Sequence, residues 1–234
     1  MSNIALIIAG GVGARMKQAI PKQFMTVYDK PIIIYTLEQF EKHPLIDAIA
    51  VVCLEGWENI LSSYARQYNI SKLKYIAPAG TVGQMSIKNG LDEIEKHCDQ
   101  DDIVLIHDAI RPLVSADIIS DCISKINEFG SAVSVIPCNE AMMQTTDGLC
   151  SAQAFPRDNL KRTQTPQGAR LSKLLEIHHK AQQLGIKESV ATCTLMTEVG
   201  EKIYFSAGSA KNIKITTSED IDIFKALLLQ SGVI

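Results

Sequence analysis

The sequence predicts an α/β protein in which an open, mostly parallel sheet is covered by helices on both faces. Short, continuous apolar runs are typical of strands that are buried on both faces of a parallel sheet. These runs alternate with segments of helical spacing, which indicates parallel strands joined by helical crossovers. The length of 234 residues suits one α/β domain. We therefore expect a single domain over residues 1–234.

The expected elements follow one another from the N-terminus. An apolar run at 4–9 that ends in glycines predicts the first strand. Ile33, Leu37 and Phe40 fall on one side of a helix at 31–40. The same patterns predict further strands at 46–54, 73–77, 103–107 and 132–137, and helices at 57–67, 86–97 and 115–129. Right-handed crossovers between these strands would give a Rossmann-like fold.

The alternation of strands and helices breaks at residues 138–164. This stretch has no clear helical pattern and contains Thr145-Thr146-Asp147-Gly148, which is typical of a hairpin turn. We expect a β-arm excursion from the sheet that meets a partner subunit. After it, the sequence predicts a helix at 171–184, a strand at 202–205 and a helix at 218–230, which Ser218 would cap.

Composition excludes several classes of protein. The net charge of −3 lacks the excess of positive charge that is typical of proteins that bind nucleic acid. The apolar run at 4–9 is too short for a membrane span and lacks the basic flank of a signal peptide. The six cysteines form no C-x-x-C pair, which favours reduced thiols in a cytoplasmic protein and argues against structural zinc. We expect no binding to nucleic acid or membranes.

A glycine-rich loop follows the first expected strand. Gly10, Gly11 and Gly13 would let backbone N–H groups approach an anion closely. The loop is not a Walker motif, and Met16 stands where a dinucleotide-binding loop has its third glycine. It brings the cations Arg15 and Lys22 instead, which suit the charge that develops on an attacked nucleotide phosphate. The alternative is a plain tight turn with solvated charges.

Two further loops at expected strand ends carry charged residues. Asp108, after a buried strand, is placed to hold Mg²⁺, and Arg111 offers a fork for a phosphate. The alternative for Asp108 is that it caps the next turn. His107 is interpreted as a packed histidine rather than an acid or base. Lys214 alternates with Ile213 and Ile215 in an expected strand and so points away from the apolar side, although a strand lysine is often only solvated.

Together, residues 9–16, 21–24, 107–112, 165–167 and 212–216 fall in the order and spacing of one family. The chain resembles the cytidylyltransferases that act on 2-C-methyl-D-erythritol 4-phosphate or D-ribitol 5-phosphate, over nearly its whole length. The resemblance implies transfer of CMP from CTP to a sugar-alcohol phosphate, release of pyrophosphate, a Mg²⁺ cofactor and a homodimer.

The resemblance also implies roles for individual residues. The catalytic cations would be Arg15, Lys22 and Lys214. The nucleotide would be bound by Ala9, Gly10, Gly11, Gly13, Pro78, Ala79, Gly80, Ser86 and Asp108, of which Asp108 would also bind the metal. The acceptor would be bound by Arg111, Arg157, Thr165 and Thr192. Exchange of the arm between subunits would let Arg157 serve the neighbouring site.

The chain departs from the family pattern at several positions. Gly83 and Met85 stand where the family usually has arginine and aspartate, Ala141 replaces a threonine, and Cys193 replaces an aspartate. Because the catalytic cations are kept, we expect the reaction type to be kept as well, while the acceptor is not fixed.

Weaker features bear on the acceptor. Gly10-Gly11, Trp57 and Gln164 favour D-ribitol 5-phosphate over 2-C-methyl-D-erythritol 4-phosphate. Two other interpretations stay open at this point. One is transfer of a different nucleotide to an aldose 1-phosphate, and the other is a degenerate member that binds nucleotide without turnover.

Overall fold

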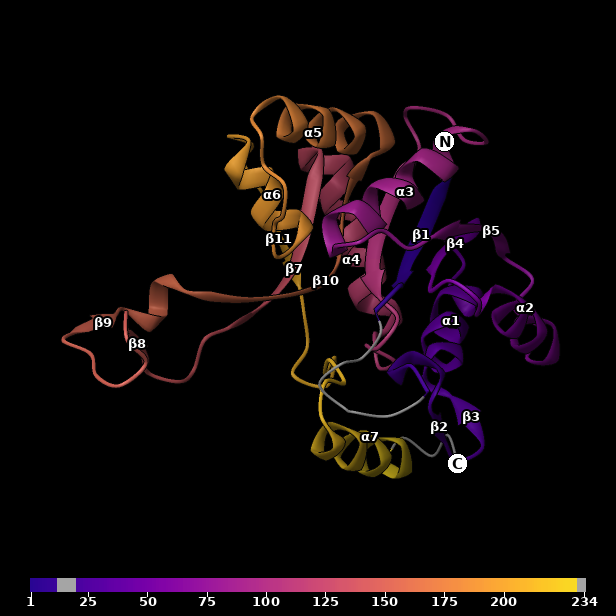
Figure 1. The fold of residues 1–234 in the computed structure, drawn as a ribbon, viewed down its shortest axis with the longest axis horizontal. Coiled ribbons are helices and arrows are strands. Elements are labelled where there is room, and N and C mark those ends of the chain that lie inside the picture. Colours follow the sequence, from indigo (N-terminus) through magenta and orange to yellow (C-terminus); the bar gives the residue numbers. More distant parts are fainter. Residues whose placement is uncertain (12–19, 231–234) are drawn as a thin grey trace.

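A computed structural model describes residues 1–11 and 20–230 (Figure 1). Its central sheet has seven strands in the order β11-β7-β10-β6-β1-β4-β5. Neighbouring strands are parallel except at β10, which is antiparallel to both β6 and β7. The predicted open, mostly parallel sheet is therefore confirmed. The strands are β1 (Asn3–Ala9), β4 (Ala48–Cys53), β5 (Leu73–Pro78), β6 (Ile103–Asp108), β7 (Ser131–Pro137), β10 (Lys161–Arg170) and β11 (Phe205–Ala207).

Helices cover both faces of this sheet, as predicted. Alternate residues of β1 enter two different cores, because successive side chains of a strand point to opposite faces. Ala5 and Ile7 pack with helices α1 (Ile32–Lys42), α2 (Glu58–Gln67) and α4 (Ala116–Phe129). Ile4 and Leu6 pack with helices α3 (Gly83–Glu95), α5 (Leu171–Gln183) and α6 (Thr192–Glu198).

The last helix, α7 (Ser218–Gln230), packs in a third and smaller core. Its Phe224 meets Tyr35 of α1 edge-on, with ring centroids 5.2 Å apart. Thr217 rather than Ser218 caps the helix: Thr217 Oγ1 accepts from the Asp220 N–H at 3.4 Å, and Asp220 Oδ2 accepts from the Thr217 N–H at 2.8 Å. The first two short strands, β2 (Thr26–Val27) and β3 (Lys30–Pro31), form a separate hairpin after the 3-10 turn η2 (Lys22–Phe24).

The predicted arm is an antiparallel hairpin of β8 (Met142–Gln144) and β9 (Gln153–Phe155), followed by the 3-10 turn η3 (Arg157–Asn159). It projects away from the body of the protein (Figure 1). Asp147 organises its turn by accepting the N–H groups of Leu149 and Cys150 at 2.9 and 3.1 Å. The expected arm boundary at 164 is wrong, because β10 already pairs with β7 from Lys161, opposite Pro137.

Four other expectations need correction. The strand predicted at 202–205 lies at Phe205–Ala207, and residues 212–216 form no strand. Strand β10 was not predicted, because its polar sequence contains Pro166, which is uncommon within a sheet. Helix α6 was also missed, since its seven residues are too few for a clear apolar period.

Candidate active site

Asp108 lies at the carboxyl end of β6, beside the end of β1, because parallel pairing sets it opposite Ile8. Arg111 donates from Nε to Asp108 Oδ2 at 3.0 Å. Lys214 Nζ lies 3.1 Å from each carboxylate oxygen. Two cations therefore share one carboxylate at the sheet edge where ligands of α/β proteins bind.

The carboxylate of Asp108 is ionised at neutral pH. Burial raises its pKa, but the positive charges of Lys214 and Arg111 outweigh burial and hold the pKa below its usual value. The side chain keeps 21% of its surface exposed, so a ligand can reach it. Among the described residues no backbone N–H donates to this carboxylate, which argues against the alternative that Asp108 only caps a turn.

A chain of hydrogen bonds holds Asp108 in place from behind. Thr165 Oγ1 accepts from the Asp108 N–H at 3.1 Å and lies 3.0 Å from His107 Nδ1. His107 Nε2 lies 3.1 Å from the Arg111 carbonyl oxygen. Because a carbonyl can only accept, Nε2 carries the proton and Nδ1 accepts from the Thr165 hydroxyl.

His107 is fully buried, and burial lowers its pKa to about 4. It is therefore neutral, and both of its ring nitrogens are occupied. The prediction that His107 is a packed histidine is confirmed.

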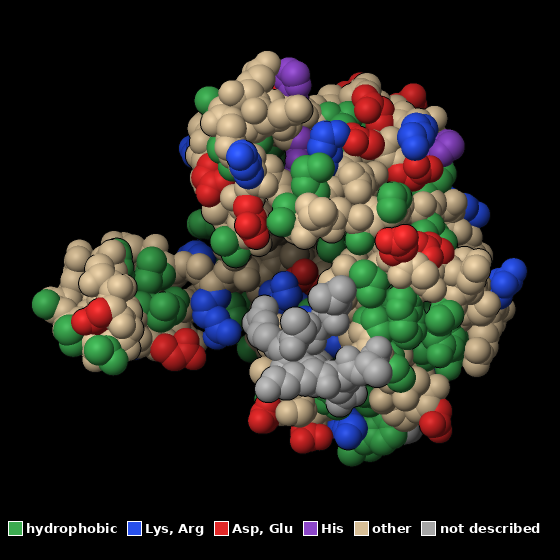
Figure 2. Space-filling view, viewed as in Figure 1, with side chains coloured by type: hydrophobic (Ala, Val, Ile, Leu, Met, Phe, Trp, Pro, Cys, Tyr) green, Lys and Arg blue, Asp and Glu red, His purple; other side chains and the backbone are tan. Residues whose placement is uncertain are grey.

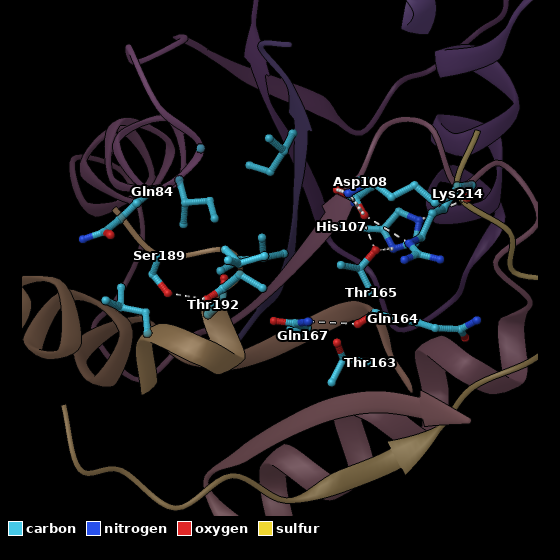
Figure 3. Close-up of a pocket in the computed structure, with 18 of the residues that line it drawn as sticks. Gln84, His107, Asp108, Thr163, Gln164, Thr165, Gln167, Ser189, Thr192 and Lys214 are labelled. Atoms are coloured by element: carbon cyan, nitrogen blue, oxygen red, sulfur yellow. Dashed lines mark hydrogen bonds and ion pairs between the residues drawn. The ribbon is translucent and has the colours of Figure 1, made fainter. Parts of the chain in front are cut away.

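The segment 212–216 carries Lys214 to Asp108 without forming a strand. Asn212 Nδ2 donates to the Thr165 carbonyl at 2.8 Å, and Arg111 Nη1 donates to the Asn212 carbonyl at 2.8 Å. The Ile215 N–H donates to the Ile110 carbonyl at 2.9 Å, and the Ile215 side chain is fully buried. Lys214 between these anchors is 42% exposed and turns toward Asp108, as Figure 3 shows.

A cavity of about 330 Å³ extends from this charged cluster toward α3, α5 and α6. Asp108 and Lys214 lie at one end in Figure 3, and Gln84 and Ser189 at the other. The structure thus brings together the predicted residues Asp108, Arg111, Thr165, Thr192 and Lys214. The whole lining consists of Ile8, Gly83, Gln84, Ile87, Ile106, His107, Asp108, Arg111, Thr163, Gln164, Thr165, Gln167, His178, Ser189, Val190, Ala191, Thr192, Leu195 and Lys214.

The predicted nucleotide loops meet beside this cavity. A Cβ atom on Gly10 would lie 2.6 Å from Ala79 Cβ, so only glycine permits this approach. The Gly80 N–H donates to Ser86 Oγ at 3.0 Å, which ties the loop after Pro78 to the start of α3. Gln23, buried next to Lys22, donates to the carbonyls of Ala9 and Gly11 at 2.7 and 3.0 Å. Gly13 and Arg15 lie outside the described residues.

Arg157 is not brought to this cavity within the chain. It lies in η3 on the exposed arm and donates from Nη1 to the Asn139 carbonyl at 3.1 Å. It lines a separate cavity of about 410 Å³ at the base of the arm. Its expected role in the site of a neighbouring subunit stays a prediction.

Sequence reasoning assigned no role to several other residues of the cavity. Gln167 Nε2 donates to the Gln164 carbonyl at 3.0 Å, and Gln167 Oε1 accepts from the Cys193 N–H at 2.9 Å, which joins β10 to α6. Gln84 and His178 stand on the buried faces of the amphipathic helices α3 and α5, where no local motif marks them. Only the packing of α3 against α5 reveals their part in the cavity.

A metal site in this cavity would contain one carboxylate among the described residues, that of Asp108. Within residues 1–11 and 20–230 there is no group of three or more His, Cys, Asp or Glu side chains that could hold a metal. One ionised carboxylate, Asp108, still fits Mg²⁺, which is often bound by one or two carboxylates together with substrate phosphates.

No helix in the described part of the chain is long and apolar enough to cross a membrane.

Comparison with known proteins identifies the family. The model of the IspD family, 2-C-methyl-D-erythritol 4-phosphate cytidylyltransferase, matches residues 3–230. The chain belongs to the IspD family. The predicted resemblance and the class of CTP-dependent nucleotidyltransferase are thereby confirmed.

Relatives of this IspD-family chain carry two different names. The ribitol-5-phosphate cytidylyltransferase of Lacticaseibacillus paracasei is 43% identical over 96% of this chain and 97% of its own length. The 2-C-methyl-D-erythritol 4-phosphate cytidylyltransferase of Clostridium botulinum (strain 657) is 37% identical over 97% of each chain. Among solved structures, the Francisella tularensis 2-C-methyl-D-erythritol 4-phosphate cytidylyltransferase covers 97% of this chain and 99% of its own, with a TM-score of 0.80 and 28% identity.

Proposed function

We propose that this chain transfers the cytidylyl group of CTP to D-ribitol 5-phosphate and releases pyrophosphate. The observation that carries the choice of acceptor is the order of the relatives. Those named ribitol-5-phosphate cytidylyltransferase, from Lacticaseibacillus paracasei and Vibrio parahaemolyticus, are 43% and 40% identical over nearly the whole chain. The Clostridium botulinum relative named for the other acceptor is 37% identical.

The charged end of the cavity suits this reaction. An oxygen of the acceptor phosphate attacks the α-phosphorus of CTP and forms a new P–O bond. The bond from that phosphorus to the bridging oxygen breaks, and its electron pair leaves with pyrophosphate. The acceptor phosphate is already anionic, so no general base is needed, in keeping with a neutral and fully hydrogen-bonded His107.

We assign the stabilisation of the developing charge to cations. Lys214 and Arg111 converge on Asp108 at 3.1 and 3.0 Å, so their charges are fixed in place before a phosphate arrives. Preorganised charges of this kind stabilise a transition state more than a mobile solvent does. Lys22, at the start of η2, and Arg15 complete the proposed catalytic set.

We further propose that Asp108 is the protein ligand for Mg²⁺ in the loaded enzyme. The ion would supply positive charge to the nucleotide phosphates. Because both oxygens of Asp108 are paired with cations, a metal would have to share or replace the contact with Lys214.

The arm is proposed to join two copies of the chain in a cytoplasmic homodimer. Its exposed apolar side chains stand out from the body in Figure 2: Met142, Met143, Leu149 and Phe155 are between 43% and 89% exposed. Apolar side chains gathered on a projecting hairpin indicate a partner surface. A second copy would bury them and could bring Arg157 to the neighbouring cavity.

A second candidate acceptor is 2-C-methyl-D-erythritol 4-phosphate. The matching family model and the relative at 37% identity carry that name. A degenerate protein that binds nucleotide without turnover is a further candidate, suggested by the Gly83, Ala141 and Cys193 departures.

One assay separates these candidates. Pyrophosphate release is measured with CTP and Mg²⁺ against D-ribitol 5-phosphate and 2-C-methyl-D-erythritol 4-phosphate, and then with ATP, GTP and UTP. We expect the highest kcat/KM with CTP and D-ribitol 5-phosphate. A higher kcat/KM with the methylerythritol substrate would assign the chain to the second candidate. No release with either acceptor would support the degenerate protein.

A further inference from the structure

The cavity that holds Asp108 has a second end with a different chemistry. Gln84 of α3 and His178 of α5 line the same cavity of about 330 Å³ as Asp108 and Lys214. Gln84 is 8% exposed and His178 is 5% exposed. In Figure 3, Gln84 lies far from the charged cluster. The cavity walls also include apolar side chains such as Ile87 and Leu195.

The amide of Gln84 is only half satisfied. Its Nε2 donates to the Ile186 carbonyl at 3.3 Å, a long hydrogen bond. Its Oε1 is buried and has no hydrogen-bond partner among the residues that the structure describes. A buried acceptor without a partner is unfavourable, so a rotation of the Gln84 amide that turns Oε1 toward a ligand hydroxyl in the cavity gains a hydrogen bond that the protein does not supply.

His178 differs from the other two buried histidines. His107 uses both ring nitrogens, at 3.1 and 3.0 Å, and so does His43, at 3.1 and 3.2 Å. Neither ring nitrogen of His178 has a hydrogen-bond partner within residues 1–11 and 20–230. Burial, helped by the charge of Lys88, lowers the pKa of His178 to about 4. The neutral ring offers one donor and one acceptor to a ligand.

The cations at one end of the cavity and the neutral polar groups at the other suit a ligand that has an anionic group at one end and hydroxyl groups at the other. We propose that Gln84 and His178 bind the hydroxyl groups of the acceptor farthest from its phosphate, and that they select an unbranched five-carbon polyol. This inference rests on the proposed function, because it places the acceptor phosphate at the cations Arg111 and Lys214.

The chemistry of the two candidate acceptors explains the selection. D-Ribitol 5-phosphate is an unbranched chain that ends in a hydroxymethyl group. 2-C-Methyl-D-erythritol 4-phosphate has the same number of carbon atoms, but one is a methyl branch, so its main chain is shorter by one carbon and one hydroxyl. A site with buried polar groups discriminates strongly against an analogue that leaves them unpaired.

The test compares two variants with two matched controls on α5. The variants are Gln84→Leu and His178→Phe. The controls are Gln183→Leu and His179→Phe, which make the same changes at exposed positions outside the cavity. For each protein, kcat and KM are measured with CTP and, in turn, D-ribitol 5-phosphate and D-erythritol 4-phosphate, which lacks the fifth carbon. Melting temperature is measured in parallel.

We expect each cavity variant to lose about tenfold in kcat/KM for D-ribitol 5-phosphate, the value of one neutral hydrogen bond. The loss should fall mainly on the KM for that acceptor, while KM for CTP, kcat/KM for D-erythritol 4-phosphate and both controls change less than about twofold. Gln84→Leu removes an unsatisfied oxygen together with one long hydrogen bond to the Ile186 carbonyl, so its melting temperature should change by no more than about 2–4 °C.

Other outcomes overturn the inference without touching the proposed function. Equal losses of kcat/KM for both acceptors, or an unchanged preference for D-ribitol 5-phosphate in both variants, would show that Gln84 and His178 do not bind the end of the acceptor farthest from its phosphate. If one variant does not fold, the other decides by the same ratio. A wild-type protein that is inactive with every polyol phosphate would instead remove the proposed function itself.

Discussion

Replacing Lys214 by alanine should remove activity while leaving the fold almost unchanged. Lys214 Nζ lies 3.1 Å from both oxygens of Asp108 and close to where the acceptor and nucleotide phosphates are proposed to meet. As the bond to pyrophosphate stretches, negative charge grows on the phosphate oxygens. A fixed ammonium stabilises that charge more than it stabilises the bound substrates, and losing one such group typically lowers kcat by about 10²–10³.

The effect on stability should be small because of the exposure of the pair. Lys214 is 42% exposed, and partly exposed ion pairs contribute about 0.2–1 kcal/mol. Asp108 also keeps its contact with Arg111 at 3.0 Å in the variant, so its charge is not left unpaired. For a protein of this length, 1 kcal/mol corresponds to roughly 2–4 °C in melting temperature. We expect a shift no larger than that.

The assay is pyrophosphate release at saturating CTP and D-ribitol 5-phosphate, with thermal unfolding measured in the same buffer. Lys211→Ala is the matched control, because Lys211 is exposed on the same segment and its side chain is outside the cavity. If Lys214→Ala kept more than about a tenth of wild-type kcat, the assignment to the transition state would be wrong. If kcat and melting temperature fell together by large amounts, Lys214 would be structural.

Three further predictions concern the same site and the arm. Asp108→Asn should lower activity and raise the Mg²⁺ concentration needed for half-maximal rate, whereas an unchanged Mg²⁺ titration would exclude Asp108 as the metal ligand. Thr165→Val leaves the Asp108 N–H and His107 Nδ1 without their shared partner. The free energy of unfolding, measured by urea titration, should therefore fall by about 1–3 kcal/mol. A fall of less than about 0.5 kcal/mol would contradict this hydrogen-bond network. Sedimentation should show a dimer that Met143→Asp and Leu149→Asp, at exposed positions of the arm, convert to monomers; a wild-type monomer at micromolar concentration would refute the proposed dimer.

The parts of the fold that the sequence predicted are those with strong local patterns. The apolar runs of β1, β4 and β6 and the periodic faces of α1 and α4 each contain enough information within the segment. Strand β10 does not, because its polar residues and Pro166 give no strand pattern. Its place between β6 and β7 depends on pairing with distant strands, which local periodicity cannot show.

The same division holds in the cavity. Asp108, Arg111 and Lys214 were predicted because charged residues at strand ends form recognisable motifs, although the strand expected around Lys214 is absent. Gln84 and His178 could not be predicted, since a glutamine and a histidine on apolar helix faces give no local signal. Their unpaired polar atoms become visible only when α3 and α5 are packed together.

The burial of His178 predicts a separate dependence of stability on pH. Burial holds its pKa at about 4 in the folded protein, below the ordinary value near 6.5 of an unfolded chain. As the pH falls through about 6.5, the unfolded chain takes up a proton that the folded protein does not. His178 therefore lowers stability progressively between about pH 6.5 and pH 4, and adds no further pH dependence below that range.

From pH 7 to pH 5, this difference in pKa corresponds to about 2 kcal/mol of unfolding free energy, or roughly 4–8 °C in melting temperature. His178→Phe should remove this contribution to the unfolding free energy, so the melting temperature of the variant should fall less than that of the wild type between pH 7 and pH 5. His43 and His107 remain in both proteins, and their contributions cancel in the comparison. His179→Phe, at an exposed position, should follow the wild type. Parallel pH profiles for wild type and His178→Phe would mean that the folded protein protonates His178 as readily as the unfolded chain does, and His178 would then not be the buried, neutral ring on which this prediction rests.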